Sequence, residues 1–141
     1  MTATKIKTAT FKHIEAELYA YPDTKKEIAR LREEILHGKA NDDENIGGGR
    51  SNIPGRPTER VATRLVMSKR LRNLEEVAEA IDRVYERLPE GHQKLVKLRY
   101  WGKYRRPTWD DIAGKLFISK RQAMRWRDEI VHLIADQLGW R

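Results

Sequence analysis

Apolar residues recur every three or four positions along almost the whole chain, which is the spacing of one face of an α-helix. The first such run predicts a helix over residues 8–20 and consists of Phe11, Ile14, Leu18 and Tyr21. A proline at position 22 is expected to end this helix. No segment alternates apolar and polar residues as a half-buried strand does, so the pattern predicts an all-α fold.

A second helix is predicted over residues 23–37. Thr24 and Glu27 have the spacing of a capping box at its start, and Gly38 fits the left-handed residue that often follows a helix. Residues 39–57 contain three consecutive glycines and two prolines, so we expect a flexible loop there. The Lys-Ser/Thr pair of a phosphate-binding loop does not follow these glycines, which favours a linker over a nucleotide site.

A third, long helix is predicted over residues 58–88, with Thr58 as its N-cap. Its apolar positions follow the alternating four-three spacing of a heptad seam: Met67, Leu71, Leu74, Ala78, Ile81, Tyr85 and Leu88. One interpretation is that the 67–88 seam joins two copies in a homodimer. The other is that this stripe packs on the first two helices as part of the core. Three heptads alone do not decide between the two.

The last third of the chain has the pattern of a helix-turn-helix. Pro89 is expected to end the long helix and to open the next one at its first turn, and Leu95, Val96 and Leu98 give that helix a buried side. Thr108 and Asp111 form a capping box for a helix that begins at Trp109. After a short turn, Ser119 and Gln122 form a second capping box, which opens the final helix. Two helices joined by such a turn are the arrangement of a helix-turn-helix.

The predicted core of the motif consists of Trp109, Ile112, Ala113, Leu116, Ile118, Ala123, Trp126 and Ile130. Five of these residues occupy the apolar positions that fix the angle between the two helices, namely Ile112, Leu116, Ile118, Ala123 and Trp126. Phe117 stands in the turn, where glycine is common because the backbone is often left-handed. A bulky residue costs ~1–2 kcal/mol in that conformation. We therefore expect either that the turn relaxes or that the ring of Phe117 is buried.

The start of the final helix carries the candidate DNA-binding side chains. They are Ser119, Lys120, Arg121, Gln122, Met124 and Arg125, joined by Arg105, Arg106 and Thr108 ahead of the motif. Arginine pairs with the edge of guanine and glutamine with that of adenine in the major groove. A serine at the amino end of a helix suits a phosphate. The alternative interpretation is a solvated basic face, but the complete motif around it favours double-stranded DNA as the partner.

The charge distribution supports this interpretation. The 141-residue chain has a net charge of +8, and residues 88–141 hold 12 of its 29 Lys and Arg residues but only 6 of its 21 Asp and Glu residues. A basic segment of this kind attracts phosphates. We therefore predict a DNA-binding domain over residues 88–141, and a helical region over residues 1–87 that serves core packing or dimerisation.

Several classes of protein are not expected. The chain has no cysteine, its four histidines are dispersed, and no nucleophile motif occurs, so neither an enzyme, a metal site nor a cofactor is predicted. No run of 18 apolar residues could cross a membrane. The first residues lack the apolar stretch of a signal peptide. These features indicate a cytoplasmic protein without a membrane partner.

The C-terminal motifs resemble region 4 of sigma factors. The matching segments are Leu88–Tyr100, Thr108–Ala113 and Ile118–Arg121. This resemblance covers about 50 residues and implies a helix-turn-helix that binds promoter DNA. It also implies that the helix ahead of the motif can help to dock on RNA polymerase.

A second resemblance spans nearly the whole chain. Glu17–Pro22, the helix over Ile28–Leu36, Asn45–Gly48 and Thr58–Ala62 are together similar to phage late-gene transcriptional activators of the RinA/ArpU type. The resemblance implies a phage or prophage origin and activation of late or packaging genes in the cytoplasm of a bacterial host.

Two other functions remain open at this point. A phage small terminase subunit is also small and helical and recognises packaging DNA, although its DNA-binding part usually comes first. A sigma-like factor that docks on RNA polymerase is the other alternative, but the N-terminal half lacks the aromatic and basic helix that melts promoters.

Overall fold

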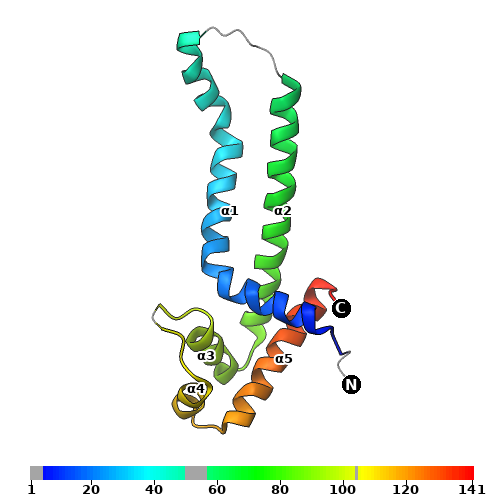
Figure 1. Cartoon of the computed structure of the whole chain (residues 1–141), viewed down its shortest axis with the longest axis vertical. Coiled ribbons are helices and arrows are strands. Elements are labelled where there is room, and N and C mark those ends of the chain that lie inside the picture. Colours follow the sequence, from blue (N-terminus) through cyan, green and yellow to red (C-terminus); the bar gives the residue numbers. More distant parts are fainter. Residues whose placement is uncertain (1–4, 50–56, 104) are drawn as a thin grey trace. The chain divides into compact units, whose positions relative to one another are not determined.

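The computed structural model describes residues 5–49, 57–103 and 105–141, with the backbone alone for residues 39–49 and 57–58. Across this part of the chain every regular element is a helix (Figure 1). The helices are α1 (Thr8–Gly49), α2 (Pro57–Arg87), α3 (Glu90–Arg99), α4 (Trp109–Leu116) and α5 (Lys120–Leu138). The predicted all-α fold is therefore confirmed.

The chain divides into two compact units. Unit 1 combines the start of the chain, up to Pro22, with Val77–Arg141, and unit 2 is Asp23–Glu76. This division differs from the predicted boundary between residues 87 and 88. The reason is that the first turns of α1 and the last turns of α2 share one hydrophobic core with the three C-terminal helices.

The core of unit 1 draws on all five helices. Its fully buried large side chains include Ile14, Leu18, Ile81, Leu95, Val96, Ile112, Ile130, Val131 and Ile134. Ala78, Ile81 and Leu88 of the predicted heptad seam are also buried within the chain. This part of the seam is therefore a core face, as the second of the two interpretations held, and not a free surface for a homodimer.

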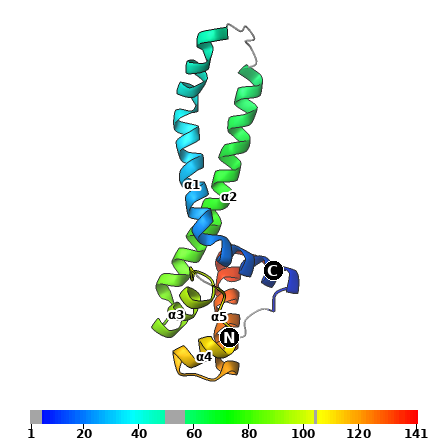
Figure 2. The same cartoon turned by 60° about the vertical axis from the view of Figure 1, so that its left-hand side comes forward.

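Unit 2 is an antiparallel pair formed by the later part of α1 and the earlier part of α2, which lie side by side in both views (Figures 1 and 2). Ile28 and Leu31 of α1 are buried. Ion pairs connect the two helices, from Arg32 to Glu75 and from Arg70 to Glu27. Because exposed ion pairs contribute ~1 kcal/mol at most, apolar burial is the larger stabilising effect in this pair.

Helix α1 passes through Pro22 without interruption, so the predicted end of a helix at this proline is wrong. A proline has no N–H and leaves the carbonyl four residues earlier without its helical donor. That carbonyl belongs to Leu18, and the indole Nε1–H of Trp101 donates to it over 2.9 Å. Since no helix begins at residue 23, the predicted capping box is also absent, and Thr24 is buried inside α1.

The predicted loop over residues 39–57 is wrong for residues 39–49, which continue α1, and its residues 50–56 lie outside the described residues. No proline occurs between positions 22 and 54, so nothing removes a helical donor in this stretch. Gly38 lies within the helix and not in a left-handed stop. Helix α2 begins at Pro57, a residue that suits the first helical position, so Thr58 is not its N-cap.

Candidate nucleic-acid interface

The helix-turn-helix is built from α4 and α5. The predicted capping box at the start of α4 is complete, whereas at the start of α5 only the half that involves the Ser119 hydroxyl is formed. Thr108 Oγ1 accepts from the Asp111 N–H at 3.1 Å, and Asp111 Oδ2 accepts from the Thr108 N–H at 3.2 Å. This is a complete capping box. Ser119 Oγ accepts from the Gln122 N–H at 3.0 Å at the start of α5. The side chains of Thr108 and Ser119 thus set where the two helices begin.

The apolar positions of the motif lie on the inner faces of α4 and α5. Ile112, Ala113, Ala123 and Ile130 are buried, while Trp109, Leu116, Ile118 and Trp126 are partly buried against the same core. The six-membered side of the Trp126 indole is close to Gly91 of α3, and its ring stacks on His92 at 4.4 Å between centroids. Helix α3 therefore packs against the Trp126 side chain of α5 and helps to hold the motif in place.

The turn between the two helices contradicts both expectations for Phe117. Its backbone is left-handed, with φ 57° and ψ 42°, so the turn does not relax. Its side chain is 92% exposed, so the ring is not buried either. The Ile118 N–H reaches the Ala113 carbonyl at 3.1 Å, which closes α4 in the way that usually calls for glycine at this position.

The start of α5 presents the predicted DNA-binding side chains to solvent. Lys120, Arg121 and Arg125 are exposed, and Gln122 and Met124 are half-buried. The first turn of α5 contains no acidic residue. The amino end of a helix carries a partial positive charge. This surface therefore combines side-chain cations with unpaired backbone N–H groups, which suits a polyanion.

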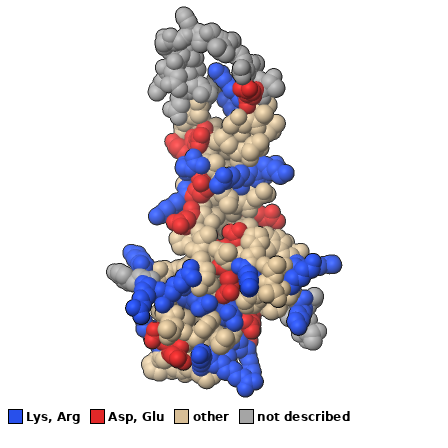
Figure 3. Space-filling view, viewed as in Figure 1, with Lys and Arg blue, Asp and Glu red and all other residues tan. Residues whose placement is uncertain are grey.

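The basic residues ahead of the motif lie in the connection between α3 and α4. Arg105 and Arg106 are both exposed. The guanidinium carbon of Arg106 lies 3.9 Å from the ring centroid of Tyr19, which comes from α1. Stacking of this kind leaves the N–H groups at the edge of the guanidinium able to donate to an anion. Lys and Arg side chains are plentiful on this part of the molecule, at the lower end of the view in Figure 3.

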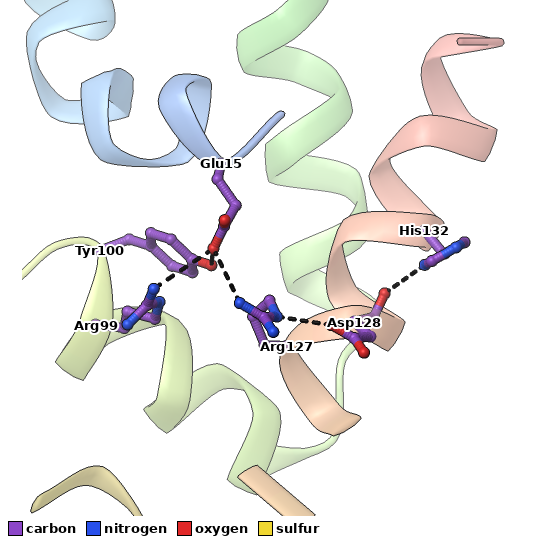
Figure 4. A network of polar contacts seen from close by, with 6 residues as sticks. All are labelled: Glu15, Arg99, Tyr100, Arg127, Asp128 and His132. Atoms are coloured by element: carbon purple, nitrogen blue, oxygen red, sulfur yellow. Dashed lines mark hydrogen bonds and ion pairs between the residues drawn. The ribbon is translucent and has the colours of Figure 1, made fainter. Parts of the chain in front are cut away.

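One arginine of α5 faces inward. The Nη1 of Arg127 lies 3.6 Å from a carboxylate oxygen of Glu15, and its Nε donates to Asp128 at 2.7 Å. The same Glu15 oxygen accepts from the Tyr100 hydroxyl at 2.6 Å and lies 3.7 Å from Arg99 (Figure 4). Burial is the main cause that raises the pKa of the Tyr100 hydroxyl, and the hydrogen bond to Glu15 raises it further. The hydroxyl therefore stays protonated and donates. This Glu15 network ties α1 to α3 and α5.

Sequence reasoning did not find the Glu15 network, although one signal for it was present. Arg127 falls four residues after Ala123 and three before Ile130, so helical spacing places it on the buried face of α5. Its guanidinium lies over the rings of Phe11 and Trp109, at 5.1 and 5.2 Å from their centroids. A cation among aromatic rings at this depth needs a carboxylate partner. Glu15 is too distant in sequence to be paired with it by spacing.

Comparison with known proteins shows the family of the chain. Residues 14–136 match a family described as "Protein of unknown function (DUF722)", and because they make up most of the chain, the chain belongs to this family. The chain is also 28% identical over 134 residues to a protein named transcriptional activator rinA from Staphylococcus phage phi11, a match that covers 95% of this chain and 94% of that protein. The resemblance to phage activators of the RinA type is thereby confirmed. No solved structure matches the chain.

The described residues contain neither a metal-binding cluster nor a membrane-spanning helix. Within them, no three His, Asp or Glu side chains lie together in a group that could hold a metal ion. None of the described helices is both long enough and apolar enough to span a membrane.

Proposed function

We propose that this protein is a sequence-specific DNA-binding transcriptional activator of phage or prophage late genes. The observation that carries the proposal is the start of α5, where exposed Lys120 and Arg121 follow the Ser119 cap and no acidic residue occupies the first turn. The name of the phi11 relative, a transcriptional activator, supports the regulatory part of the proposal.

In this proposal the first two turns of α5 enter the major groove. Arg121 and Arg125 are four residues apart and therefore share one face of the helix. Arginine donates two hydrogen bonds to guanine, and Gln122 on the neighbouring face can pair with adenine. Met124 adds an apolar contact. These side chains specify the base sequence.

Other residues position the protein on the DNA backbone. Lys120, Arg105 and Arg106 contact phosphates, and Ser119 and Thr108 lie at the amino ends of the two motif helices, where backbone N–H groups also suit phosphates. The hydroxyls of Ser119 and Thr108 already accept the capping hydrogen bonds. Their contribution is therefore the orientation of the helix ends.

The direct test is DNA binding by the wild type and by an Arg121→Ala/Arg125→Ala variant. The probes are duplexes from the region flanking the protein's own gene, measured at two salt concentrations against random competitor DNA. The matched control is Arg64→Ala/Arg72→Ala, which removes the same charge from exposed positions on α2. We expect selective binding by the wild type and the control, and a loss of at least about 30-fold in the α5 variant, since each good arginine–base contact contributes ~1–3 kcal/mol.

The opposite result has a clear form. Equal, weak and steeply salt-dependent binding of all duplexes by the three proteins would mean that charge alone is at work. The proposed reading of bases by α5 would then be wrong.

The activating role needs a second measurement. Transcription by bacterial host RNA polymerase from a late promoter is expected to rise when the protein is added, and the Arg121→Ala/Arg125→Ala variant is expected to give no increase. RNA polymerase is thus a proposed partner, in the cytoplasm of the host. A ring of eight or more subunits in solution, together with no effect on transcription, would instead support a small terminase subunit.

A further inference from the structure

Phe117 combines two unfavourable features in one residue. It is the only residue besides glycine in the described part of the chain that has a positive φ, and its ring is 92% exposed. A left-handed backbone disfavours every residue with a β-carbon, and glycine adopts it freely. An exposed phenyl ring gains nothing from the hydrophobic effect. The fold therefore makes no use of this side chain.

The position of Phe117 suggests where the ring is used. It stands two residues before the Ser119 cap, directly ahead of the end of α5 that is proposed to enter the groove. The charged side chains nearest in sequence are Lys115, Lys120 and Arg121, all basic and all exposed. A partner that approaches this ring must therefore tolerate or prefer a positive surface, and duplex DNA does so.

We propose that the ring of Phe117 contacts the apolar surface of duplex DNA, and so helps to determine its sequence preference. Two groups of DNA offer such a surface, the 5-methyl group of thymine in the major groove and the C–H face of deoxyribose. This inference rests on the proposed function, because it requires that the start of α5 faces DNA. It adds a residue of the turn to the residues of α5 that read the site.

The test uses two substitutions that suit a left-handed backbone, Phe117→Gly and Phe117→Asn. The probe is a duplex selected from a random pool by the wild-type protein. We expect both variants to bind it about tenfold more weakly, while their thermal unfolding midpoints stay the same or rise by a few degrees. The matched control is Leu133→Gln, which removes another exposed apolar side chain from a later turn of α5. This control is expected to bind as the wild type does.

A set of duplexes that each carry deoxyuridine in place of one thymine separates the two surfaces. If the ring contacts a methyl group, one replacement weakens wild-type binding about fourfold, as expected for the loss of one buried methyl group, and does not change binding by Phe117→Gly. If the ring contacts deoxyribose, no replacement affects either protein, and the Phe117 variants remain weaker. Either result supports the inference.

Two results would overturn it. Wild-type affinity in Phe117→Gly would show that the ring does not touch DNA, and its partner would then be another protein such as RNA polymerase or a second copy of the chain. A clear fall in the unfolding midpoint would show that the ring serves the fold. Both results leave the Arg121→Ala/Arg125→Ala test untouched, so failure of this inference is distinguishable from failure of the proposed function.

Discussion

The indole of Trp101 supplies the hydrogen bond that Pro22 withholds from Leu18. In a helix without proline the N–H of residue 22 would donate to the Leu18 carbonyl, but proline has no N–H, and Trp101 Nε1 donates to that carbonyl instead at 2.9 Å. The ring of Trp101 also stacks on Tyr21, at 4.8 Å between centroids. Trp101, which lies 83 positions after Leu18 in the sequence, therefore allows α1 to continue through its proline.

A double-mutant cycle tests this substitution of one donor for another. Trp101→Phe is expected to cost ~1–3 kcal/mol of unfolding free energy, because it leaves the Leu18 carbonyl without a donor and removes part of a ring. In a Pro22→Ala background the N–H of residue 22 can take over, so the same change should cost about 1 kcal/mol less. Chemical denaturation of the four proteins gives the coupling energy. Equal costs in the two backgrounds would contradict the proposed exchange of donors.

The Glu15 network predicts an unequal effect of two similar substitutions in α1. Glu15→Gln leaves Arg99 and Arg127 without their shared counter-charge, and all three side chains are less than one-fifth exposed. We expect a loss of ~1–3 kcal/mol in the unfolding free energy. Glu17→Gln is the control, because its partner His13 is more than half exposed and such pairs contribute little. The midpoints of urea denaturation of Glu15→Gln and Glu17→Gln measure the difference. Similar midpoints would mean that the Glu15 network stabilises the fold no more than an exposed ion pair does.

The close approach of Gly91 to Trp126 predicts that Gly91→Ala destabilises the protein when the Trp126 ring is present and stabilises it when the ring is absent. A β-carbon at Gly91 would lie 2.8 Å from the Trp126 ring, which is held in place by its stack on His92. His92 in turn contacts Glu129 at 2.8 Å. Gly91→Ala should therefore destabilise the wild type by ~1–3 kcal/mol, the usual cost of overpacking.

In a Trp126→Leu background the same Gly91→Ala change should stabilise the protein, since alanine is favoured over glycine in a helix by ~1 kcal/mol. Thermal unfolding of the pair of backgrounds checks both signs. If Gly91→Ala destabilised the protein in both backgrounds, the steric clash would not be with the Trp126 ring.

The C-terminal helices were predictable because local rules decide them. The Thr108 and Ser119 caps lie within three residues of their partners, and the apolar spacing of α4 and α5 matches the face that is buried. Nothing beyond a short window of sequence is needed to derive either feature. The same holds for the end of α2, where Pro89 enforces a stop.

Features that depend on distant partners were not predictable. Every local rule predicts that a helix ends at Pro22. Helix α1 continues because Trp101, which is distant in sequence, donates a hydrogen bond to the Leu18 carbonyl. The ring of Phe117 was expected to be buried if its backbone was left-handed, but it is 92% exposed, and we propose that its partner is DNA. Arg127 looked like one more member of a basic run, and its partner Glu15 lies on another helix more than 100 positions away.

Helix α5 separates two tasks along its length. Its first two turns carry the exposed Lys120, Arg121 and Arg125, whereas Ile130, Val131, Ile134 and Ala135 of the later turns lie deep in the core. Under the proposed function, related phages that compete within one host would alter which promoters respond by exchanging a few codons for the exposed positions of the early turns, without renewing the rest of the gene. An engineer can follow the same route and exchange Lys120, Arg121 and Arg125 while the buried Ala123 and the remainder of the protein are inherited unchanged.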